Sequence, residues 1–103
     1  MIQVVVTMII KEGKMEPFLT ECKKLRPRVL AEKGCLGYEY FREIPSPLGN
    51  QEPVQKNRIT LLERWESMDA LKTHSSMPHM KEFLDRVKDL RESVSSRVLE
   101  PAF

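Results

Sequence analysis

The stretch that decides the fold is Ile2-Gln3-Val4-Val5-Val6-Thr7-Met8-Ile9-Ile10. Its residues are β-branched or apolar at both odd and even positions, and only Gln3 and Thr7 are polar. Because alternate residues of a strand point to opposite faces of its sheet, this pattern predicts a central strand buried on both faces. The sheet built around it must therefore be covered on both sides.

A helix is expected next, from about Met15 to Lys33. Pro17 suits its first turn, Pro27 predicts a kink, and Gly34 supplies a C-terminal stop. Apolar side chains recur at helical spacing and form one stripe for burial, made of Phe18, Cys22, Leu25 and Val29.

The second half of the chain alternates between strand and helix patterns. Strands are predicted from Gly37 to Ile44 and from Arg58 to Glu66. In both stretches alternate residues form two sets that would point to opposite faces of a sheet. Ser67 is placed to cap a helix, which Pro78 breaks into a short and a longer piece. A last strand is expected from Ser93 to Glu100. The longer helical piece carries one apolar face, made of Met80, Phe83, Leu84, Val87 and Leu90.

The order β-α-β-β-α-β is that of a ferredoxin-like, or split βαβ, domain of the α+β class. A chain of 103 residues supports one such domain, residues 1–103. Two helices can cover only one face of a four-stranded sheet, yet the first and third strands carry apolar side chains on both faces. A second copy packed sheet against sheet would cover the open face, so we expect a homodimer.

Composition and charge bear on the partners and the compartment. The net charge is +2, and the densest basic stretch, Lys23 to Arg28, is expected to be a solvated helix face and not a nucleic-acid site. The opening apolar run is too short to span a bilayer and lacks a cleavage site, so no membrane insertion is expected. Cys22 and Cys35 show neither metal nor redox spacing, and reduced thiols indicate a cytoplasmic protein.

Three further stretches are distinctive: Glu63-Arg64-Trp65-Glu66-Ser67, His74-Ser75-Ser76-Met77-Pro78-His79-Met80 and Lys33-Gly34-Cys35-Leu36-Gly37-Tyr38. Together with the closing Leu99-Glu100-Pro101, they resemble the antibiotic biosynthesis monooxygenase family over nearly the whole chain. The resemblance implies a dimeric α/β-barrel. It also implies, as for some members, oxygenation of quinols or polyphenols by O2 without metal, flavin or other cofactor. Residues 45–57 match no family pattern and are a candidate for setting substrate choice.

Haem and metal cofactors are not expected. One branch of the superfamily degrades haem with an asparagine on the first strand and a histidine in the second helix. The corresponding positions here hold Thr7 and Leu84, so an axial ligand is missing. For a metal, His74 and His79 are too few, and no Cys, Asp or Glu stands at a supporting spacing.

His74 is the first candidate for catalysis. Imidazole exchanges protons near neutral pH, which suits a general base for a phenolic hydroxyl. His74 lies near the Pro78 break, where a cavity edge is expected; the alternative is an ordinary surface histidine. His79 follows five positions later with a proline between, need not share a face with His74, and is a candidate for substrate binding.

Four residues of the predicted sheet are further candidates. Tyr38 and Tyr40 share a strand face and either line a substrate pocket or cover the dimer interface. Trp65, beside Leu61, is either core packing or part of the substrate site. Glu63 shares this apolar face as a candidate catalytic residue. Such a carboxylate either pairs with an arginine, which is the favoured interpretation, or has a raised pKa.

The first hypothesis for function is therefore a cofactor-independent monooxygenase that oxidises a quinol or related hydroxyaromatic with O2. Such an enzyme must hold its small aromatic substrate, favour the deprotonated form and exclude water. Two alternatives stay open. One is an isomerase of small hydroxylated or phosphorylated carbonyl compounds, as among some relatives, and the other is a non-catalytic module that binds a small aromatic.

Overall fold

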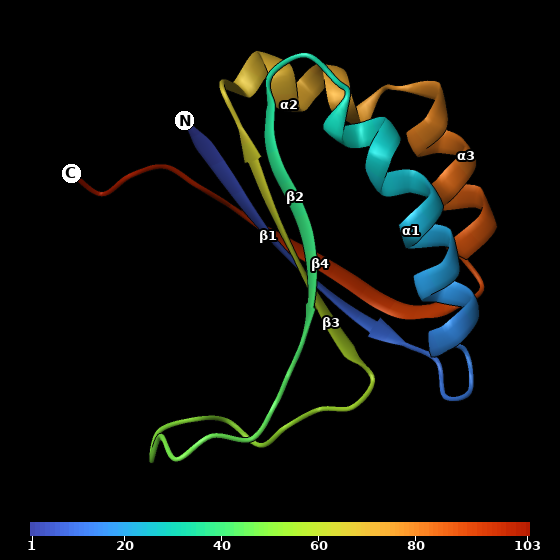
Figure 1. Cartoon of the computed structure of the whole chain (residues 1–103), viewed down its shortest axis with the longest axis vertical. Helices are drawn as coiled ribbons and strands as arrows, with labels where there is room; N and C mark the ends of the chain where they lie inside the picture. The colour runs from blue at the N-terminus through green and yellow to red at the C-terminus, as the bar shows by residue number, and fades with distance from the viewer.

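The computed structural model describes the whole chain, Met1–Phe103. The elements follow in the order β1 (Ile2–Ile10), α1 (Met15–Leu30), β2 (Cys35–Arg42), β3 (Arg58–Trp65), α2 (Met68–Ser75), α3 (Pro78–Val87) and β4 (Arg91–Leu99). The strands form one antiparallel sheet in the order β2-β3-β1-β4, and the helices lie together on one face of it (Figure 1). This confirms the ferredoxin-like α+β fold, with the second helix divided in two.

β1 lies inside the sheet, as its apolar sequence predicts. Val6 faces Leu61 of β3 on one side and Ser96 of β4 on the other. The even-numbered side chains of β1 are buried beneath the helices, namely Val4, Val6, Met8 and Ile10. The odd-numbered residues Val5, Thr7 and Ile9 point to the opposite face and are partly exposed in the single chain.

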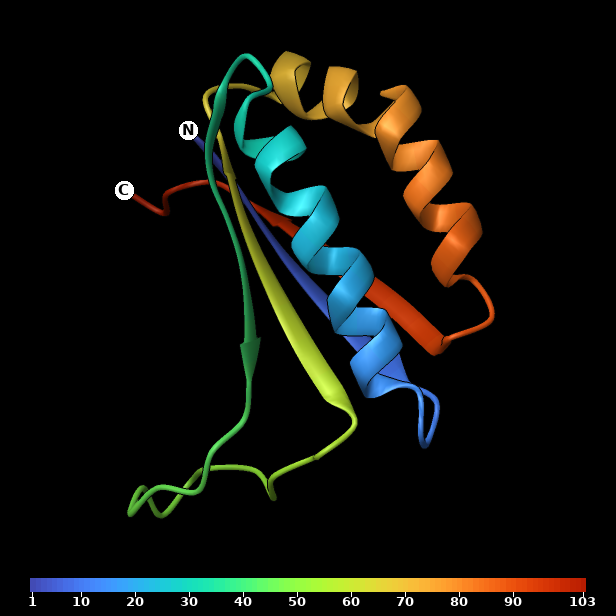
Figure 2. The same ribbon diagram turned by 45° about the vertical axis from the view of Figure 1, so that its right-hand side comes forward.

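The second helical segment divides where proline predicts. α2 ends at Ser75 and α3 begins at Pro78, whose missing N–H is no loss at the first position of a helix. Figure 2 shows α3 running at an angle to α2 and alongside α1. The stripes of α1 and α3 that face the core are Phe18, Cys22, Leu25 and Val29, and Met80, Phe83 and Val87. Leu84 was expected on the buried face but is 43% exposed, because Met80, Phe83 and Val87 already fill that face. None of the helices has the length and apolar character needed to cross a bilayer.

Two strands begin earlier than predicted. β2 starts and ends two residues early, because Cys35 already pairs with Trp65 and the chain leaves β3 after Arg42. β4 also begins two residues early, at Arg91, which pairs with Ile10. In both cases hydrogen bonding to the neighbouring strand begins before the residues whose alternating pattern predicted the strand.

The sheet face opposite the helices is open and partly apolar. Phe41, Leu62 and Leu99 are each more than a third exposed there, beside Val5 and Ile9 of β1. Polar and charged side chains separate them, including Glu39, Thr60, Arg64, Ser95 and Arg97. This is the face that a second copy is expected to cover.

Residues 43–57 connect β2 to β3 and project from the end of the sheet that lies away from α2 (Figure 1). The base of this loop is held by an ion pair between Glu43 and Arg58. Within one chain the loop therefore lies far from the segment that contains His74 and His79.

Candidate functional site

His74 lies in the last turn of α2. The helix begins after Ser67, whose hydroxyl accepts a hydrogen bond from the Ala70 N–H at 3.1 Å, so the predicted cap is confirmed. His74 is only 4% exposed. It is therefore not the ordinary surface histidine that was the alternative. Because α2 packs onto the sheet, its inward-facing histidine is enclosed instead.

A carboxylate that was not among the predicted candidates holds His74. Nδ1 of His74 lies 2.9 Å from Oε2 and 3.2 Å from Oε1 of Glu32. Both side chains are at most 5% exposed, so water is largely excluded from the contact. Because a carboxylate only accepts hydrogen bonds, Nδ1 of His74 is the donor, and Nε2 is left as the free ring nitrogen.

Glu32 reaches this position because the chain turns sharply after α1. The helix ends at Leu30, three residues earlier than predicted, and the turn leads directly into β2. Gly34 in this turn has a φ of +86°, and a Cβ at that position would lie 2.7 Å from the Cβ of Ala70. Glycine is thus needed both for the backbone conformation and for the close approach to α2. That approach brings Glu32 to His74.

His79 meets the same carboxylate from the first turn of α3. Its Nε2 lies 2.7 Å from Oε2 of Glu32, the oxygen that is also nearest to His74. The break at Pro78 redirects α3, so the two imidazoles converge although their spacing did not predict it. The His79 side chain is 15% exposed and borders a hollow between α1 and α3. His74, Glu32 and His79 form what we call the histidine cluster, with His79 as its outer member.

Glu63 of β3 lies on the other side of His74. Its Oε1 accepts a hydrogen bond from the indole N–H of Trp65 at 3.0 Å and lies 3.9 Å from Nε2 of His74. The favoured prediction that Glu63 pairs with an arginine is therefore wrong, because its partners are an indole and an imidazole. Burial raises the pKa of Glu63, and the Trp65 and His74 contacts offset this only in part.

Aromatic rings enclose the inner histidine. The Trp65 ring centroid lies 4.5 Å from that of His74, and the Tyr38 ring meets His74 edge-on at 5.7 Å. Tyr38 in turn meets Tyr40 edge-on at 5.7 Å. Trp65 is fully buried, so it is a core residue that also packs on the candidate base. Tyr38 and Tyr40 lie beneath the helices, and they are therefore not on the open face expected to form a dimer interface.

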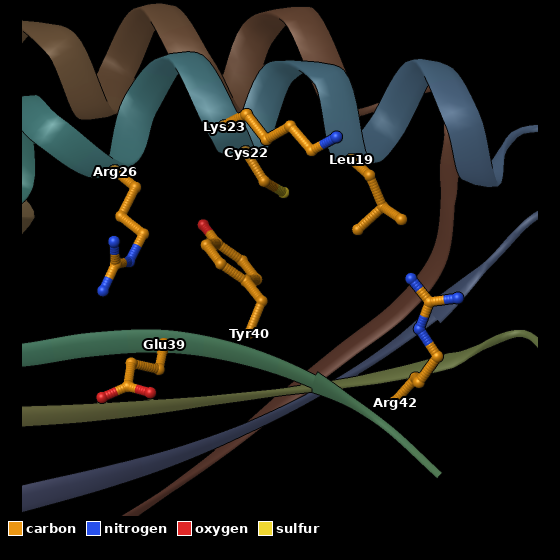
Figure 3. Close-up of a pocket in the computed structure, with 7 residues that line it drawn as sticks. All are labelled: Leu19, Cys22, Lys23, Arg26, Glu39, Tyr40 and Arg42. Atoms are coloured by element: carbon orange, nitrogen blue, oxygen red, sulfur yellow. The ribbon is translucent and has the colours of Figure 1, made fainter. Parts of the chain in front are cut away.

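A hollow of about 340 Å³ opens between α1 and β2 beside Tyr40 (Figure 3). The close-up shows the Tyr40 ring standing between strand and helix, with its hydroxyl pointing toward α1. The lining residues are Leu19, Cys22, Lys23, Arg26, Glu39, Tyr40 and Arg42. His74 does not line this hollow, and Tyr38 lies between Tyr40 and His74 in edge contact with both rings.

The arrangement is suited to proton transfer. His74 offers one free ring nitrogen, and Glu32 stands behind the other to stabilise a positive charge on the ring. No three His, Cys, Asp or Glu side chains are grouped so that they could hold a metal ion. Burial raises the pKa of the Cys22 thiol to about 12, which makes it a poor nucleophile.

Of the predicted site residues, the structure brings His74, His79, Glu63, Trp65 and Tyr38 together, and Tyr40 lies one ring further away. Glu32 was missed. A weak signal for it existed, since it stands two positions before the glycine that ends the helix. An acidic residue next to a turn is usually solvated, however, so nothing in the sequence favoured it.

Known proteins resemble this chain in sequence and in fold. The profile of a family described as antibiotic biosynthesis monooxygenase matches residues 1–86. The chain belongs to the antibiotic biosynthesis monooxygenase family. The "Probable quinol monooxygenase YgiN" of Escherichia coli (strain K12) is 32% identical over 83 residues, which cover 81% of this chain and 79% of that protein.

Solved structures extend the likeness in fold. A conserved protein from Methanosarcina mazei Go1 has a TM-score of 0.82 at 24% identity, covering 96% of this chain and 90% of that one. PA3566 from Pseudomonas aeruginosa has a TM-score of 0.82 at 20% identity, covering 99% and 94%. The predicted membership of the antibiotic biosynthesis monooxygenase family is thus confirmed, and it identifies the chain as a monooxygenase.

Proposed function

We propose that the chain is a cofactor-independent monooxygenase that oxidises a quinol or related hydroxyaromatic with O2. The observation that carries the proposal is His74, a buried imidazole fixed through Nδ1 by Glu32, with Nε2 free among aromatic rings. The name of the Escherichia coli relative supports the same class of substrate.

The first step is the removal of a proton from the bound hydroxyaromatic. Its O–H bond breaks, the proton passes to Nε2 of His74, and the electron pair stays on the phenolate oxygen. The imidazolium that forms has Glu32 at 2.9 Å, and the attraction is strong because water is excluded. Glu32 is thus a positioning residue that fixes the ring and favours its protonated form. Glu63 faces Nε2 and is placed to accept or return a proton there.

The second step uses the electron-rich phenolate itself as the reductant. It passes one electron to O2, and the resulting radical pair combines to form a carbon–oxygen bond. The peroxide that forms takes up the proton held by His74. The C–H bond at the same carbon then gives up its proton, its electron pair forms a carbonyl, and the O–O bond breaks. One oxygen atom stays on the substrate as this carbonyl, and the other leaves with the released proton as water. The protein supplies no redox group, and its task is to orient the substrate and keep water away.

We assign substrate contacts to the rings of Trp65, Tyr38 and Tyr40. These rings offer flat apolar surfaces of the kind that hold an aromatic substrate; Trp65 and Tyr38 lie beside the candidate base, and Tyr40 lies one ring further away. His79 acts through Glu32, so its replacement should change affinity more than the rate of the proton transfer.

Oxygen consumption across a panel of reduced quinols tests the proposal. The expected result is enzyme-dependent O2 uptake that a metal chelator leaves unchanged. Activity that disappears on chelation and returns with a metal would contradict the cofactor-independent part. Carbonyl migration without O2 uptake would indicate an isomerase, and tight binding without turnover would indicate a binding module.

We also propose that the enzyme is a homodimer that buries the open sheet face. Phe41, Leu62 and Leu99 form the exposed apolar part of that face. Light scattering should report about twice 12.0 kDa. Leu62→Glu should give monomers, whereas Leu48→Glu, in the exposed loop, should not. A folded wild-type monomer at micromolar concentration would refute the dimer. We place the protein in the cytoplasm, in keeping with its free thiols.

A further inference from the structure

Two buried polar atoms in the chain have no hydrogen-bond partner: the hydroxyl oxygen of Tyr40 and Nε of Arg91. Such atoms are rare, because each one gives up its hydrogen bond to water on folding and gains none in return. Arg91 Nε–H can only donate, and the Tyr40 hydroxyl can donate as well. Their missing partner is therefore an acceptor, and the positive charge of the guanidinium favours an anionic one.

The two orphaned groups belong to the same region between α1 and the sheet. Arg91, at the start of β4, reaches over β1, where its Nη1 lies 3.8 Å from Sδ of Met8. Its charge acts on Cys22, where it lowers the pKa of the thiol against the larger effect of burial. Cys22 and Tyr40 line the same hollow, and Figure 3 shows the Tyr40 hydroxyl pointing toward α1. The two donors thus come from β2 and β4, the two edge strands of the sheet, and the contact with the buried Met8 places Arg91 on the same helix-covered face as Tyr40.

The charges at the rim of the hollow also favour an anionic ligand. Lys23, Arg26 and Arg42 line it together with a single carboxylate, Glu39. None of the three cations has a carboxylate oxygen within ion-pair distance, unlike Lys24, Arg28 and Arg86 nearby. An anion that entered would pass cations that have no carboxylate partner, although Arg26 Nε donates to the Tyr38 carbonyl oxygen at 2.6 Å, and would meet the two donors without partners further in. Leu19 and the Tyr40 ring add the apolar surface that an aromatic body needs.

We propose that the hollow between α1 and β2 binds the carboxylate of a hydroxyaromatic acid, with Tyr40 and Arg91 as the inner donors and Arg42 and Arg26 at the rim. This rests on the proposed function and names the substrate class within it. Tyr38 lies between Tyr40 and His74 in edge contact with both rings, so an acid held here would lie one ring away from the candidate base. The Tyr40 hydroxyl has no hydrogen-bond partner within the chain, so it can donate to the carboxylate without losing one.

Calorimetric binding of 1-hydroxy-2-naphthoate and of its neutral methyl ester tests this directly. The two ligands share a ring system and differ in the anionic oxygen. The wild-type protein should bind the acid at least about 10-fold more tightly than the ester, as expected for charge-assisted hydrogen bonds in a largely buried site. Tyr40→Phe and Arg91→Met should each remove most of that preference and leave ester binding unchanged. Arg28→Met, an exposed arginine on the far side of α1, is the matched control and should keep it.

Thermal melting separates a binding role from a structural one. If Arg91 is kept for a ligand, Arg91→Met removes an unsatisfied buried donor and should melt at or above the wild-type temperature. Equal affinity for acid and ester in the wild type would overturn the proposal, and so would an unchanged preference in both variants. Because neither measurement uses O2, failure of the monooxygenase assay with correct acid binding would refute the proposed reaction and leave this site standing.

Discussion

Glu32→Gln replaces one carboxylate oxygen by an amide NH2 in a side chain that two imidazoles share. Oε2 of Glu32 lies 2.9 Å from Nδ1 of His74 and 2.7 Å from Nε2 of His79, while Oε1 lies 3.2 Å from Nδ1 of His74. A glutamine that keeps its oxygen at the Oε2 position must place its NH2 group, a donor, against the Nδ1–H of His74. The flipped amide loses both contacts at Oε2. Neither orientation reproduces the carboxylate.

The geometry sets the size of the effect. A hydrogen bond to a charged group contributes about 1.5–3 kcal/mol, against about 0.5–1.5 kcal/mol for a neutral one, so two weakened bonds cost about 2 kcal/mol. The new donor–donor contact adds to this, since leaving a buried donor without an acceptor costs about 1–3 kcal/mol. We therefore expect the free energy of unfolding to fall by about 2–4 kcal/mol. For a domain of this size, the melting temperature should drop by about 10 °C or more.

Urea unfolding measures the change. The midpoint should fall while the slope with denaturant stays the same, because the fold is kept. Glu82→Gln is the matched control, since Glu82 is 58% exposed and lies 3.8 Å from Arg28, and its loss should cost less than about 1 kcal/mol. If Glu32→Gln is no more destabilising than Glu82→Gln, Glu32 does not hold the two histidines by charge. The assignment of Glu32 as the positioning residue would then fail.

Further perturbations test the site and the turn beside it. His74→Ala should lower kcat by about 100- to 10,000-fold and weaken substrate binding far less, and a normal kcat in steady-state oxygen uptake would exclude His74 as the base. Burial raises the pKa of the Glu63 carboxyl above its ordinary 4.5, so the folded protein holds the carboxyl proton to higher pH than the unfolded chain does. The free energy of unfolding should therefore fall as the pH rises from about 4.5 through the raised pKa. Glu63→Gln should flatten this part of the curve in denaturation series at several pH values, and an unchanged curve would show that Glu63 ionises freely. Gly34→Ala should destabilise the fold by more than the roughly 1–3 kcal/mol of backbone strain expected for Gly13→Ala, since both glycines have positive φ but only Gly34 would clash with Ala70. Equal losses would show that the turn can move away from α2.

The sequence by itself determined the elements and their order. The apolar run from Ile2 to Ile10 specified a strand with two faces to cover, Ser67 specified a helix start, and Pro78 specified a break. These features are local, because a strand repeats every two residues and a helix every 3.6, and caps and prolines act on their own backbone. The distinctive stretches around Trp65 and Pro78 also identified the family before any contact was known.

Only the tertiary structure decided which side chains meet. Glu32 is 42 positions from His74 and 47 from His79, and no periodicity links residues so far apart. Their contact depends on how closely the turn at Gly34 approaches α2. The partner of Glu63 was predicted wrongly for the same reason, since the nearest arginine in sequence, Arg64, points to the opposite face of the sheet. Tyr40 and Arg91 likewise lie on β2 and β4, the two edge strands of the sheet, and a pattern read along one strand cannot show what reaches over from another.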